Sequence, residues 1–221
     1  MNNQQNPRLF ILGSMSGIIG TICYIMAIAF TMNPQITFLV AMAWPVLFIV
    51  FGYSLYRYIT LQKQSASNQL AFVLGCLALA MVAMMISIQL AVKTGIEEHI
   101  TKTLNGEQEV LKLMKYSLRW VDLGVDVAWD LFIGASLIFL GIALKGRTHF
   151  GLWWSIPAAT LGVIIIAINA VTFPLPPNTQ GLFDVGPFIG TYMIILAIRL
   201  LYLGLRMKKG NPPGVKLPIE F

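Results

Sequence analysis

Residues 119–130 read RWVDLGVDVAWD and open an apolar run that continues through residue 144. Within this stretch, Asp122, Asp126 and Asp130 follow one another at intervals of four residues. Because an α-helix advances about 100° per residue, the three carboxylates fall on one stripe of a helix. The run is long enough to cross a bilayer, where an ionisable side chain is costly and generally faces a partner, a cavity or a functional site. The stretch therefore predicts a membrane-spanning helix whose acidic stripe faces protein.

The composition of the whole chain is that of a membrane protein. Of its 221 residues, 57% are hydrophobic and 11% are charged, whereas soluble domains are roughly a quarter charged. The net charge of +6 does not indicate nucleic-acid binding, because the Lys and Arg residues stand at the ends of apolar runs and form no single patch. The composition thus predicts the lipid bilayer as a partner and argues against nucleic acid.

Apolar runs of the length that a transmembrane helix needs, about 20 residues, recur along the chain. They cover residues 10–31, 36–58, 70–92, 119–144, 151–173 and 183–207. We therefore predict an all-α fold, a polytopic bundle of six transmembrane helices that forms a single integral membrane domain over residues 1–221.

Residues 94–118 differ from these runs, because they mix Glu and Lys with isolated apolar residues. Asn105 and Gly106 form a turn signal that divides this segment into two short amphipathic pieces. Such pieces are typical of helices that lie on a membrane surface or cap a bundle. We predict an outer amphipathic helical segment between the third and fourth spans, with a plain solvent-facing hairpin loop as the alternative.

The distribution of Lys and Arg predicts the orientation of the bundle. One set of span ends carries most of these residues, from Arg8 to Lys216, whereas two of the three opposite connections carry none. Since cytoplasmic loops are enriched in Lys and Arg, we expect both termini to lie in the cytoplasm. The predicted location is therefore the inner (plasma) membrane, which the chain crosses several times.

The orientation places several polar side chains at similar heights. Counting about 1.5 Å per residue puts Asp130 about 17 Å below Arg119 and Arg199 about 18 Å below Pro187, so we expect Asp130 and Arg199 to pair. Polar residues of other spans fall at the outer level of the acidic stripe. We predict a polar pocket that opens outward and is built from Asp122, Asp126, Asp130, Arg199, Asn169, Gln89, Asp184 and Tyr192.

This pocket is compatible with three functions. A structural or regulatory membrane subunit is the first hypothesis, because no enzyme motif is present and Asp–Arg contacts can fix helix packing. A transporter or channel-like protein would handle a cation or small cationic solute through the acidic cavity. An intramembrane lipid-modifying enzyme would use the carboxylates to hold a divalent metal. The sequence assigns no metal and no cofactor, and it leaves open whether the chain is an enzyme.

Gly13 and Gly17 of the first span form a small-xxx-small pattern. This pattern lets two helices approach closely. It predicts a tight contact on that face, either with another span of the same chain or with a partner helix.

Several short motifs of the second half stand in a fixed order. They are DLFIG at 130–134, Gly141, the basic loop at 145–149, Trp153, LG at 161–162 and DVGP at 184–187. In these motifs the chain resembles a family of uncharacterised bacterial six-span integral membrane proteins of about this length. That family has no assigned activity, so the resemblance implies the number of spans and no substrate.

Overall fold

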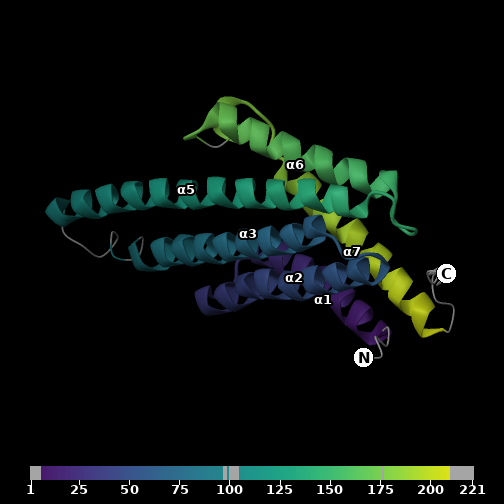
Figure 1. Cartoon of the computed structure of the whole chain (residues 1–221). Helices are drawn as coiled ribbons and strands as arrows, with labels where there is room; N and C mark the ends of the chain where they lie inside the picture. Colours follow the sequence, from purple (N-terminus) through teal and green to yellow (C-terminus); the bar gives the residue numbers. More distant parts are fainter. Residues whose placement is uncertain (1–5, 97–98, 100–104, 176, 210–221) are drawn as a thin grey trace, which may run out of the picture.

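The computed structural model describes residues 6–96, 99, 105–175 and 177–209, and these residues are helical, with no strand among them (Figure 1). The helices are α1 (Pro7–Ala29), α2 (Pro34–Gln62), α3 (Ala66–Ala91), η1 (Val92–Ile96), α5 (Asn105–Leu144), α6 (Leu152–Thr172), η2 (Pro177–Gln180) and α7 (Gly186–Lys208). Within the described part of the chain, six helices are long and apolar enough to cross a membrane. The predicted all-α class is therefore confirmed, and the number of helices that are long and apolar enough to cross a membrane equals the predicted number of spans.

Local sequence sets where the first two helices begin. Asn6 and Asn33 are N-caps, and each is followed by a proline at the first helical position. The Asn6 side chain accepts a hydrogen bond from the backbone N–H of Arg8 at 3.1 Å, and the Asn33 side chain accepts one from Gln35 at 3.0 Å. Each cap accepts a hydrogen bond from a backbone N–H that has no acceptor inside the helix. Proline is tolerated at the first helical position because the N–H that it lacks would have no intrahelical partner there.

Helices that follow one another along the chain pack side by side. α1 packs on α2, α2 on α3, α3 on α5, and α5 on α6, while α7 returns to pack against α1. By contrast, α6 and α7 make only slight contact. Figure 1 shows α5 between α3 and α6, with α7 crossing the bundle obliquely.

The glycines of α1 make a close contact within the chain. Gly13 is buried against Ser54 of α2, and Gly17 is buried against Phe51 of the same helix. The small-xxx-small pattern therefore serves the α1–α2 contact, which is one of the two alternatives that the sequence leaves open.

The segment 94–118 differs from the prediction. Asn105 and Gly106 begin helix α5, which runs without a break to Leu144, so separate surface helices are not confirmed. Residues 97–98 and 100–104 lie outside the described residues. The 40 residues of α5 correspond to about 60 Å, twice the hydrocarbon thickness of a bilayer. Its N-terminal end accordingly extends beyond the ends of α3 and α6 (Figure 1).

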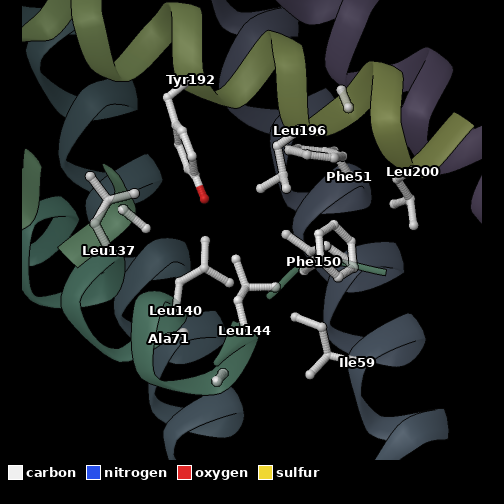
Figure 2. Close-up of a cluster of buried hydrophobic side chains, with 14 of the residues drawn as sticks. Phe51, Ile59, Ala71, Leu137, Leu140, Leu144, Phe150, Tyr192, Leu196 and Leu200 are labelled. Carbon is white, nitrogen blue, oxygen red and sulfur yellow. The ribbon is translucent and has the colours of Figure 1, made fainter. Parts of the chain in front are cut away.

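A packed apolar core occupies the end of the bundle where α5 finishes (Figure 2). We call this the core end. Its fully buried side chains come from α2, α5 and α7 and include Phe51, Ile59, Leu137, Leu144, Leu196 and Leu200. Polar side chains of α5 and α6 lie toward the opposite end, which we call the cavity end.

We predict that Gly162→Ala lowers the free energy of unfolding by about 1–3 kcal/mol, the usual cost of overpacking. A Cβ atom at Gly162 of α6 would meet the backbone oxygen of Gly134 of α5, which has no room to move. The matched control is Gly124→Ala in α5, where the added methyl meets nothing within 4 Å and removes a helix-destabilising glycine. Thermal unfolding in detergent measures the stability of both variants. Equal shifts of the melting temperature in the two variants would contradict the close α5–α6 contact.

Candidate functional site

A large cavity lies at the cavity end of the bundle. Its volume is about 610 Å³, and residues of all six long helices and of the loop before α7 line it. This volume lies within the range of small-molecule pockets, about 300–1,000 Å³. We call it the acidic cavity.

Carboxylates from two parts of the chain line the acidic cavity. Asp126 and Asp130 come from successive turns of α5, and Asp184 comes from the loop before α7. Asp184 and Asp126 are close enough to interact electrostatically. No Lys or Arg belongs to the cavity lining among the described residues. The lining therefore gathers acidic side chains without a matching basic side chain.

Asp130 is held in place by α6. Its residue is 8% exposed, and its Oδ2 accepts a hydrogen bond from Nδ2 of Asn169 at 2.7 Å. The same Asn169 nitrogen donates to the backbone oxygen of Ile165 at 2.9 Å, which fixes the orientation of the amide. No described residue donates a hydrogen bond to Oδ1 of Asp130. A neutral donor thus fixes the carboxylate and leaves one of its oxygens available.

Aromatic side chains form a second part of the cavity lining. The rings of Tyr24 on α1 and Trp44 on α2 lie 4.3 Å apart between centroids, with 34° between their planes. Trp129, the residue before Asp130, also lines the cavity. Trp44 and Trp129 pack against the same small apolar cluster of Ala41, Val82 and Ile86. The aromatic rings of three helices therefore converge near the acidic stripe.

Sequence pattern alone gives no reason to place Trp44 and Trp129 in the site. Tyr24, Trp44 and Trp129 stand within apolar runs, where an aromatic ring is typical of ordinary core packing. Their signal is spatial, because they come together only when α1, α2 and α5 pack around one cavity.

Two of the predicted site residues lie one helical turn away from the cavity lining. Nε2 of Gln89 donates to Oδ2 of Asp122 at 3.2 Å and so joins α3 to α5. Oδ1 of Asp122 is buried without a hydrogen-bond partner among the described atoms. The pair extends the acidic stripe of α5 beyond the cavity.

Tyr192 lies in the apolar core rather than in the cavity lining. It is 8% exposed, and its hydroxyl donates to the backbone oxygen of Trp154 at 2.9 Å. Figure 2 shows its ring beside Leu137 and Leu196. The bond links α7 to α6 where the two helices otherwise make little contact.

The predicted pairing of Arg199 with Asp130 is wrong. Nε and Nη2 of Arg199 donate to the backbone oxygen of His149, at 3.3 and 3.0 Å, in the loop after α5. Arg199 therefore lies level with the end of α5, whereas Asp130 lies about 21 Å before that end. The expected pairing assumed that Arg119 and Pro187 lie at the same height in the bundle, and the observed bonds of Arg199 to His149 do not agree with this.

The donor set of the site does not form a metal centre. Among the described residues, no three His, Cys, Asp or Glu side chains gather closely enough to hold one ion. The carboxylates of the acidic cavity are therefore spread around its wall rather than focused on one point.

Comparisons of the chain with protein-family models, with curated proteins and with solved structures give no match. The acidic cavity itself is therefore the basis on which a function is argued.

We predict that the Asp130–Asn169 bond shows strong energetic coupling. Asn169→Leu removes the one described donor to a buried carboxylate and should lower the free energy of unfolding by about 1–3 kcal/mol. Adding Asp130→Leu should recover much of this loss, because no buried polar group then lacks a partner. Thermal unfolding of the single and double variants measures the coupling.

The control for this cycle is Asn68→Leu. Asn68 is equally buried but bonds Tyr56 and Thr60 on α2. The stability lost in Asn68→Leu should not be recovered when Asp130→Leu is added. Strictly additive losses in the Asp130–Asn169 cycle would show that the two side chains do not depend on each other.

Proposed function

We propose that this chain is a multi-pass membrane protein that binds a small cationic solute in the acidic cavity. The observation that carries the proposal is the cavity of about 610 Å³ that gathers three carboxylates with no Lys or Arg in its described lining. Carboxylates inside a membrane protein are costly unless something compensates them, and they commonly mark solute pathways. A bound cation supplies that compensation.

The arrangement of the carboxylates supports a route from solution to Asp130. Asp184 is exposed at the cavity end, Asp126 lies between, and Asp130 is buried next to Asn169. A cation arriving at Asp184 therefore meets further negative charge along the acidic stripe of α5. Each carboxylate lowers the energy of the next position, which favours entry.

The core end closes the other side of this route. Leu137, Leu144, Leu196 and Leu200 are packed there without exposed surface. In this proposal, passage of a solute across the membrane requires these side chains to separate, as alternating access would require.

The proposal includes an orientation. The distribution of Lys and Arg supports cytoplasmic termini, which places the cavity end on the outer face of the membrane. The resemblance to bacterial six-span proteins supports an inner-membrane location.

A second candidate function is that of a structural or regulatory subunit in a larger assembly. Its support is the projecting end of α5, where Val110, Leu113 and Met114 are 58%, 66% and 50% exposed. Exposed apolar side chains on one segment commonly mark a contact with another chain. No comparable observation favours a lipid-modifying enzyme.

We predict that the detergent-solubilised chain binds cations in a manner that depends on its cavity carboxylates. Isothermal titration would use sodium, magnesium and tetraethylammonium chlorides as probes. At least one cation should bind the wild type, and Asp126→Asn with Asp130→Asn should weaken that binding at least about tenfold, equivalent to 1.4 kcal/mol.

The control variant is Glu109→Gln, which removes a carboxylate that bonds Lys112 on the exposed part of α5. Its cation binding should equal that of the wild type. If no probe binds, or if the Asp variants bind as well as the wild type, the proposed function fails and the subunit hypothesis becomes the better one.

A further inference from the structure

We infer that the solute is an organic ammonium ion with an apolar body, rather than an inorganic cation. This inference rests on the proposed function and specifies the ligand class of the same cavity. Three features carry it: the spread of the carboxylates, the aromatic wall, and the free oxygen of Asp130.

The spread of the carboxylates does not suit an inorganic ion. Calcium and magnesium need several oxygens that converge at about 2.0–2.6 Å from one point. The described residues hold no such group of three His, Cys, Asp or Glu side chains. The cavity of about 610 Å³ instead has room for a molecule of many atoms.

The aromatic wall suits an ammonium group. The rings of Tyr24 and Trp44 are stacked on each other at a tilt, so each has one face that the other does not cover, and Trp129 precedes Asp130 on α5. The faces of Trp and Tyr rings attract cations, and recognition of quaternary ammonium by aromatic cages is the best known use of this attraction. An inorganic ion gains less here, because it keeps its water shell.

The oxygen Oδ1 of Asp130 provides a binding position for the ammonium group. Asn169 occupies Oδ2 and is itself neutral, and no Lys or Arg lines the cavity among the described residues, so Asp130 has no basic partner. Asp130 and Trp129 are neighbours that both line the cavity. A cationic head beside Oδ1 therefore meets a carboxyl group in a cavity that the Trp129 ring also lines.

The remaining lining supplies contacts for an apolar body. Aliphatic side chains from five helices face the same cavity, among them Ile25, Leu79, Val82, Met85, Ile133, Ile165, Ile168 and Ile194. A ligand with hydrocarbon attached to its cationic head buries that hydrocarbon here, which is favourable in proportion to the area removed from water.

The test is isothermal titration of the solubilised full chain with benzyltrimethylammonium, choline, the neutral choline isostere 3,3-dimethylbutan-1-ol, sodium and magnesium. We expect both ammonium ions to bind, benzyltrimethylammonium more tightly than choline. The neutral isostere should bind at least about tenfold more weakly than choline, because it lacks the charge.

Variants locate the site. Trp129→Leu should weaken benzyltrimethylammonium binding about five- to thirtyfold, the range of a cation–π contact. Trp129→Phe keeps an aromatic face and should retain most of the binding, which separates loss of the ring from loss of folding. The control is Trp153→Leu at a residue that is 91% exposed, and its binding should be unchanged.

Each outcome separates the inference from the proposed function. If sodium or magnesium binds in an Asp126- and Asp130-dependent manner and the ammonium ions do not, the inference is overturned while the proposed function stands. If the neutral isostere binds as well as choline, or Trp129→Leu binds as the wild type does, the inference is also overturned. If no cation binds, both fail.

Discussion

The hydrogen bond from Asn169 to Asp130 stands at the boundary between the two halves of the bundle. On one side of it, the stripe of α5 carries Asp122 and Asp126, and on the other side the same stripe continues as Ile133, Leu137 and Leu144. One face of a single helix therefore builds both the acidic cavity and the apolar core. Because a helix in a bilayer satisfies its own backbone, such a change of side-chain chemistry costs no backbone hydrogen bond.

The kind of partner that Asp130 has decides what the cavity can do. A basic partner such as Arg199 would neutralise the carboxylate and occupy the space beside it. The amide of Asn169 instead satisfies one oxygen and leaves the other without a described donor. The acidic cavity thus holds a carboxyl group in a fixed orientation with no basic side chain beside it.

The sequence was sufficient for those features that depend on one helix at a time. The apolar runs gave the spans, and the four-residue spacing of the Asp residues gave the stripe. The relative heights of side chains on different helices could not be predicted as well. Asn169 was expected at the level of Asp122 and Asp126 but bonds Asp130, and Arg199 was expected level with Asp130 but lies level with the end of α5. Asn105–Gly106 resembled a turn but begins a helix. Trp44 and Trp129 carried no linear signal.

The unbroken length of α5 has a mechanical consequence. One rod of 40 residues joins the projecting segment around Leu113 to the carboxylates of the cavity and to Leu144 at the far end. Helices of this length bend only gently unless a proline or a bulge interrupts them. A displacement of the projecting end is therefore transmitted along the helix to both the acidic stripe and the apolar core, because one rod carries both.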